Sequence, residues 1–246
     1  MSVLLAMLKA GLVKRPSYRI IFCLSLTDLC IGLENCLYAI AIFDSQNQSK
    51  YRQYYKILKT LTTFFLMTSI NIMALVSFDR YQRMRSLQSR DLPKRVVNGL
   101  ILVCLWLPLV TVLLPFLLPC KSVCAVLPTM GFCFSFTAIT IWSIKIIRAI
   151  SKYIENSEGP LRENLVENEK HATKTIIIIS ACFLVFHSPV IIALLVTTIF
   201  GASRLNNHLI GIGVLLSSCN SIINPILYSF RTKPIRKTFR KLFSHS

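Results

Sequence analysis

Six stretches of this sequence are each long and apolar enough to cross a lipid bilayer. A helix that spans a hydrocarbon core of about 30 Å needs about 20 mostly apolar residues with few charges. The stretches run from Ile20 to Phe43, Ile57 to Phe78, Val96 to Pro119, Val123 to Ile150, Thr175 to Phe200 and Leu209 to Phe230. The sequence therefore predicts an all-α membrane protein with several spans.

The charge of the chain fits this class. Only 15% of the 246 residues are charged and 54% are hydrophobic, whereas about a quarter of a soluble domain is charged. A formal net charge of +18 is also typical of nucleic-acid-binding proteins. However, most of the 28 lysines and arginines flank one side of the predicted spans, and basic residues near span ends stay preferentially in the cytoplasm. Topology and contacts with membrane lipids thus explain the charge, no nucleic-acid partner is expected, and the C-terminus is predicted to be cytoplasmic.

The two ends of the chain differ from the six spans. The segment from Val3 to Val13 contains Lys9 and, at about 1.5 Å per residue, reaches across only about half of the hydrocarbon core. We interpret it as the inner half of a first helix whose outer half is absent from this chain. Residues 232–246 begin with apolar side chains at helical spacing among lysines and arginines, a pattern typical of an amphipathic helix at the membrane surface. The expected division is therefore a seven-helix domain, residues 1–231, followed by this surface helix and a short tail.

Polar side chains inside the spans need a reason, because a bilayer makes them costly. They can hold helices together through hydrogen bonds, or they can form a hydrated pocket that binds a cation. We favour the first interpretation for Asn220 and Asn224 taken alone, whereas Asp28 in the middle of a span favours the second. The residues concerned are Ser25, Thr27, Asp28, Ser69, Asn71, His187, Asn220 and Asn224.

Five short motifs follow one another along the spans. Each is weak alone, but all five stand in the right order on the right helices, and together they resemble the rhodopsin-like (class A) G-protein-coupled receptors. The last motif and the residues after it look most like the melanocortin, cannabinoid, lysophospholipid and adenosine receptor group. The motifs are Leu24-Ser25-Leu26-Thr27-Asp28 in the second helix, Asp79-Arg80-Tyr81 closing the third, Trp106 with Pro115 in the fourth, Phe183 with Pro189 in the sixth, and Asn224-Pro225-Ile226-Leu227-Tyr228 ending the seventh.

The resemblance implies a seven-transmembrane helix bundle in the plasma membrane with two states. An extracellular ligand would shift the equilibrium between these states from outside, and a heterotrimeric G protein would shift it from inside. It also implies that Arg80 pairs with Glu169 in the resting state, and that sodium is an allosteric ion, with no other cofactor. The implied switch residues are Asp79, Arg80, Tyr81, Glu169, Pro189, Pro225 and Tyr228, and the implied sodium site comprises Asp28, Ser69, Asn220 and Asn224.

The residues expected to line the outer pocket are mostly apolar, which suits a lipid or another hydrophobic small molecule. Thr62 stands where amine receptors carry an aspartate, which argues against a biogenic amine. Lys59 lies near the expected mouth of the pocket and is a candidate partner for a lipid head group. The expected ligand-pocket residues are Lys59, Thr62, Leu66, His187, Ile191, Leu194, Val214 and Ser218.

Two features belong to segments that the topology assigns to the outside. Cys120 and Cys124 lie four residues apart in the second outer loop and are a candidate disulfide. Two free thiols are the alternative, because the geometry that a disulfide requires is not visible in a sequence. Asn47-Gln48-Ser49 is a glycosylation sequon in the first outer loop, so Asn47 is a candidate glycosylation site.

Other classes of protein fit the sequence less well. An enzyme is not expected, because the sequence has no HExxH, no Gly-x-Ser-x-Gly and no phosphate-cradling Gly-rich loop. A small ion transporter or channel would use Asp28 and the asparagines as an ion path, but the internal repeats and broken helices typical of transporters are missing. A signalling-dead or fragmentary receptor paralogue is a further alternative, since only six and a half of the seven helices are present.

Overall fold

The computed structural model describes residues 2–43, 48–85, 92–117, 121–155, 160–201 and 204–231. Asn47, Cys120 and the predicted surface helix over 232–246 lie outside these ranges. The side chains of Cys124, Glu169, Pro225 and Tyr228 also lie outside the described part, although their backbone is helical. Glycosylation, the disulfide and the surface helix therefore stay predictions.

Seven α-helices and one short 3-10 helix make up nearly all of the described residues. In chain order they are α1 (Ser2–Lys9), η1 (Leu12–Lys14), α2 (Pro16–Phe43), α3 (Gln48–Arg85), α4 (Lys94–Leu117), α5 (Lys121–Glu155), α6 (Pro160–Phe200) and α7 (Arg204–Arg231). The short first helix agrees with the predicted half-length segment, and Gly11, with a φ of 62°, separates it from η1.

Five of these helices are long and apolar enough to cross a membrane, with apolar segments Pro16–Leu37, Lys56–Arg83, Lys94–Leu114, Val126–Ala149 and Lys174–Phe200. The apolar part of α7 is shorter, His208–Asn224. Large apolar side chains lie on the outer faces of the bundle: Trp106, Phe134 and Leu215 are 60%, 72% and 67% exposed. Such apolar surface marks a face that contacts lipid or another partner rather than water.

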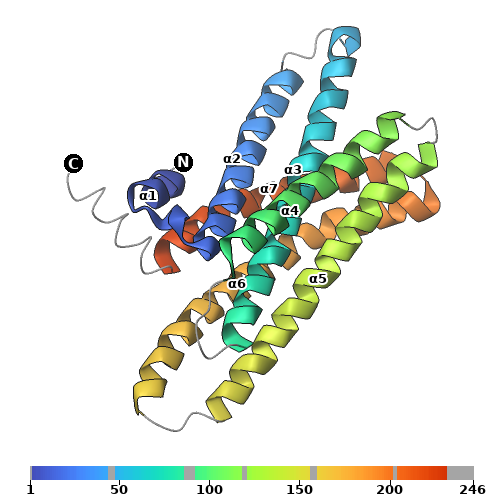
Figure 1. Cartoon of the computed structure of the whole chain (residues 1–246). Coiled ribbons are helices and arrows are strands. Elements are labelled where there is room, and N and C mark those ends of the chain that lie inside the picture. The colour runs from blue at the N-terminus through green and yellow to red at the C-terminus, as the bar shows by residue number, and fades with distance from the viewer. Residues whose placement is uncertain are drawn as a thin grey trace.

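The helices form an up-and-down bundle around α3. The end of α2 and the start of α3 lie at one end of the bundle, whereas the end of α5 and the start of α6 lie at the other (Figure 1). Helix α3 contacts α2, α4, α5 and α6, and its residues from Leu66 to Met73 are all buried. The short helix α1 contacts α2 and α7. Side chains of α3 can therefore touch most of the other helices at every depth of the bundle.

A close approach of two backbones fixes the packing of α6 against α7. A Cβ atom added to Gly213 would lie 2.6 Å from Cα and 2.7 Å from the backbone nitrogen of Val190, the residue after Pro189. Real Cβ atoms do not approach backbone so closely, so this position requires glycine. Small residues at helix interfaces are the usual way in which membrane helices pack closely.

Candidate functional site

Side-chain hydrogen bonds of α2 lie at three depths of the bundle, and further ones join α3 to α5 at Asn71 and Ser135 and α3 to α6 at Ser77 and Ser180. Each depth involves α2, and each joins α2 to α3 or α7. We call them the middle cluster, the outer cluster and the inner network, and define each by its residues below.

The middle cluster comprises Asp28, Ser69, Asn220 and Asn224, the residues of the predicted sodium site. The structure buries all four. Asn224 Nδ2 donates to Asp28 Oδ2 at 3.1 Å, and Ser69 Oγ donates to Asp28 Oδ1 at 3.5 Å. These bonds join α2, α3 and α7 around one carboxylate, between residues up to 196 positions apart, whereas no described hydrogen bond joins Asn220 to Asp28.

The oxygens of the middle cluster are not all satisfied. The side-chain oxygens of Asn220 and Asn224, together with Ser25 Oγ, are buried without a hydrogen-bond partner among the described residues. Burying a carbonyl oxygen without a hydrogen-bond partner lowers the stability of the fold, because the oxygen gives up its bonds to water. A carboxylate with neutral oxygens is also the ligand type that hard cations prefer. The donor set therefore fits a sodium ion, which would be held by Asp28, Asn220, Asn224 and Ser69.

The outer cluster contains two predicted pocket residues and two that the sequence analysis missed. Thr62 Oγ1 lies 2.5 Å from Glu34 Oε1, and Asn35 Nδ2 donates to Ser218 Oγ at 2.9 Å. Glu34 is only 4% exposed, and its second oxygen, Oε2, has no partner. The signal was present in the sequence, because a glutamate inside a predicted span requires the same explanation as an aspartate.

The apolar residues of the predicted pocket are mostly buried. Leu66, Ile191 and His187 are 2%, 6% and 2% exposed, and Leu194 and Val214 are partly buried against the main core. Lys59 is exposed, and no described contact joins it to the other predicted lining residues. The structure therefore shows polar contacts of Thr62 and Ser218 with α2 but leaves Lys59 at the surface.

His187 forms a stacked pair with Phe183 within α6. The ring centroids are 3.9 Å apart and the planes differ by 7°. Nδ1 lies 3.0 Å from the carbonyl oxygen of Phe183, and because a carbonyl only accepts, Nδ1 donates. Nε2 is buried without a partner among the described residues. A hydrogen-bonded core histidine is thus what the local geometry shows.

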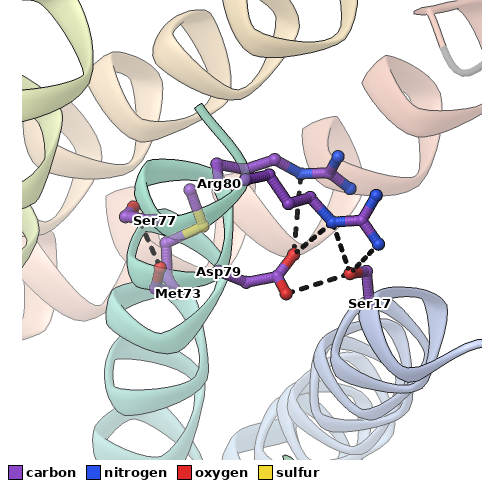
Figure 2. A network of polar contacts seen from close by, with 6 residues as sticks. Ser17, Met73, Ser77, Asp79 and Arg80 are labelled. Atoms are coloured by element: carbon purple, nitrogen blue, oxygen red, sulfur yellow. Dashed lines mark hydrogen bonds and ion pairs between the residues drawn. The ribbon is translucent and has the colours of Figure 1, made fainter. Parts of the chain in front are cut away.

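The inner network joins the start of α2 to the end of α3 through Ser17, Asp79, Arg80 and Arg83. Ser17 Oγ donates to Asp79 Oδ1 at 2.9 Å, and Figure 2 shows this contact beside Arg80. Arg83 donates to Ser17 Oγ from Nε at 3.0 Å and from Nη2 at 2.6 Å, and its Nε lies 3.5 Å from Asp79 Oδ2. The sequence analysis missed Arg83, although an acid and a base four residues apart share one helix face.

Arg80 itself is held less firmly. Its Nε lies 4.0 Å from Asp79 Oδ2, at the limit of an ion pair, and has no hydrogen-bond partner (Figure 2). The side chain is only 11% exposed. Most of the guanidinium hydrogens of Arg80 are thus not committed to Asp79, whereas Asp79 is already paired with Ser17 and Arg83.

Tyr81 connects α3 to α5. Its ring lies 5.2 Å from that of Trp142, which also contacts Phe78 at 5.0 Å. Lys145 Nζ lies 4.4 Å from the centroid of the Trp142 ring, within the range of a cation–π interaction. The inner end of α3 is therefore bound to α2 on one side and to α5 on the other.

Comparisons with known proteins agree with this architecture. The family model described as 7 transmembrane receptor (rhodopsin family) matches residues 1–228. The structure of squid rhodopsin superposes with a TM-score of 0.73 at 17% identity, covering 99% of this chain and 80% of that one. The chain therefore belongs to the rhodopsin family of seven-transmembrane receptors, and it is a multi-pass membrane protein and not an enzyme.

Similar curated sequences come from more than one receptor type. Adenosine receptor A2b of Canis lupus familiaris is 30% identical over 105 residues, 41% of this chain and 31% of that protein. The same receptor of Gallus gallus is 33% identical over 106 residues, again 41% and 31%. Octopamine receptor 2 of Lymnaea stagnalis is 28% identical over 74 residues, 30% and 13%. The aligned parts thus span less than a third of each of these relatives.

Proposed function

We propose that this protein passes an extracellular chemical signal to a heterotrimeric G protein across the plasma membrane, with its C-terminus in the cytoplasm. One observation carries the proposal. Asp79 is bonded by Ser17 and paired with Arg83, while Arg80 Nε lies 4.0 Å from Asp79 and has no hydrogen-bond partner in the described part of the chain. An arginine in that state can bind either an acid of its own chain or a partner protein.

In the resting state Glu169 would be the acid that pairs with Arg80. Glu169 lies in α6, twenty residues before Pro189, and α6 contacts α3. An arginine–carboxylate pair is charge-assisted and can form two parallel hydrogen bonds. Such a pair would hold the inner ends of α3 and α6 together, and its release would open the inner face to a G protein.

A charge-neutral variant tests this latch. We expect Glu169→Gln to raise basal G-protein activation, because a neutral amide pairs with Arg80 more weakly than a carboxylate does. The measurement is a panel of G-protein biosensors in cells at matched surface expression, with Glu167→Gln as the control because it removes the same charge two residues away. Equal basal activity in wild type and Glu169→Gln would contradict the latch.

Sodium would be the allosteric ion of the middle cluster. Asp28, Ser69, Asn220 and Asn224 supply a carboxylate and neutral oxygens, two of them without partners. A cation held there would join α2, α3 and α7 and so stabilise the resting arrangement of these helices. Its binding would give the bundle a ligand that prefers one of two states, as the proposed receptor function requires.

The outer ligand would be a small molecule with a hydrophobic body, such as a lipid. Most of the predicted lining residues are apolar, and Leu66 and Ile191 are buried between helices. Sites for such ligands are usually apolar with a few placed polar groups. Thr62 and Ser218 would be two of those groups, since both face α2 at the outer end of the bundle.

A further inference from the structure

Glu34 is a buried carboxyl group with only one partner among the described residues. Its side chain is 4% exposed, and Thr62 Oγ1 is the single group that an observed hydrogen bond joins to it, at Oε1. Oε2 is buried with no hydrogen-bond partner, and no described basic side chain lies within ion-pair distance of Glu34. A buried carboxylate normally has a cation or several donors around it.

The hydrogen bonds of Thr62 show that its one proton cannot satisfy both neighbours. Thr62 Oγ1 lies 2.5 Å from Glu34 Oε1 and 2.9 Å from the carbonyl oxygen of Leu58, and a hydroxyl group has one hydrogen to donate. If that hydrogen goes to Leu58, the hydrogen between Thr62 and Glu34 must come from a neutral Glu34. If it goes to Glu34, the Leu58 carbonyl keeps its helical backbone bond, but Oε2 of an ionised Glu34 still has no donor among the described residues.

The middle cluster shows what a protein-satisfied carboxylate looks like in the same bundle. Asp28 receives hydrogen bonds at both of its oxygens, from Asn224 and Ser69. Glu34 differs because Asn35, its neighbour, donates instead to Ser218 across the interface with α7. Oε2 of Glu34 is thus a buried oxygen with no donor among the described residues.

We propose that Glu34 anchors the ammonium group of a ligand whose hydrophobic body lies against the apolar lining residues of the outer pocket. This inference rests on the proposed receptor function and narrows its ligand class to cationic amphiphiles. The ammonium group donates hydrogen bonds to Oε2 and supplies the positive charge that an ionised Glu34 needs beside it. The carboxylate lies on α2 and contacts Thr62 of α3, which stands where amine receptors carry an aspartate.

The test uses three probes of equal chain length that differ only in head group: hexylamine, 1-hexanol and hexanoate. The measurement is the thermal unfolding midpoint of the detergent-purified full chain, followed by tryptophan fluorescence. Hexylamine should raise the midpoint of the wild type by about 3–6 °C at ten times its Kd, and 1-hexanol and hexanoate should raise it by less than half as much.

Three variants locate the effect. Glu34→Gln should lose the shift with hexylamine, whereas Glu34→Asp, which keeps the charge, should retain a preference for hexylamine over 1-hexanol. Thr63→Val should keep the full shift, because the described hydrogen bond of the Thr63 hydroxyl lies within its own helix, to the Lys59 carbonyl.

Any of three results in the amine series would contradict the proposal that Glu34 anchors an ammonium group: a full hexylamine shift in Glu34→Gln, equal shifts with hexylamine and 1-hexanol, or no hexylamine shift in the wild type. A larger shift with hexanoate would also contradict it and would point to Lys59 instead. If Glu34→Gln does not fold, Glu34→Asp decides the matter, since loss of the amine preference there would also contradict the anchor. The readout needs no G protein, so its failure leaves the signalling proposal standing, and failure of signalling leaves this result intact.

Discussion

At the residue scale, three buried acids differ in how many partners surround them. Asp79 is held by Ser17 and Arg83, with Arg80 at the limit of an ion pair. Asp28 is bonded by Asn224, Ser69 and Ser221 but lies near no described base, and Glu34 has Thr62 alone among the described residues. A buried charge needs a partner of opposite charge or several donors. Asp79 is therefore an acid already paired with a base, whereas Asp28 and Glu34 can each accept a cation.

Sodium binding at Asp28 can be measured without knowing the agonist. We expect sodium chloride, compared with choline chloride at constant ionic strength, to raise the unfolding midpoint of the wild type by about 3–6 °C at ten times the Kd of sodium. Asp28→Asn should lose this shift because it removes the only charge of the middle cluster. Glu34→Gln serves as the control and should retain it, and an undiminished shift in Asp28→Asn would rule out the site.

At the element scale, the interface between α6 and α7 depends on one glycine. Gly213 lies so close to Val190 that a side chain would meet backbone atoms, which cannot move like the end of a flexible side chain. The contact lies directly after Pro189, the proline inside α6. The close packing of α7 against α6 therefore lies beside Pro189.

Two glycines of α7 make a matched pair for testing this contact. Gly213→Ala should lower the free energy of unfolding by about 1–3 kcal/mol, the usual cost of overpacking, and so lower the thermal midpoint of the purified protein. Gly211→Ala should leave the midpoint unchanged or slightly higher, because nothing lies within 4 Å of its added Cβ and alanine favours helix. Equal midpoints for the two variants would show that the close approach does not constrain the interface.

Much of the element order was predictable from the sequence, whereas several contacts were not. Long apolar runs predicted the spans, and the motif containing Asp28 and that containing Asn224 predicted their meeting. The contact of Ser17 with Asp79 was not predictable, because it depends on how the start of α2 is rotated against the end of α3. The role of Glu34 was not predictable either, because its burial and its contact with Thr62 depend on how α2 packs against α3.

At the scale of the whole molecule, polar contacts of α2 occur at the inner end, the middle and the outer end of the bundle. At the inner end Ser17 bonds Asp79 of α3, and in the middle Asp28 is bonded by α3 and α7. At the outer end Glu34 contacts α3 and Asn35 contacts α7. A ligand that changes the outer contacts of α2 therefore acts on the helix pair that also carries Arg80. This gives the outer ligand and the inner partner a shared set of helices whose arrangement both can bias.

The central claim is that Arg80 at the inner end of this bundle activates a G protein. The most direct measurement is basal activation of a panel of G-protein biosensors by wild type, Arg80→Ala and Arg95→Ala at matched surface expression. Arg95 is an exposed arginine at the start of α4, so its variant controls for loss of a basic charge on the same side. We expect at least one G-protein subtype to respond to the wild type and to Arg95→Ala but not to Arg80→Ala. Equal activation by wild type and Arg80→Ala, or no response of any subtype to the wild type, would contradict the claim.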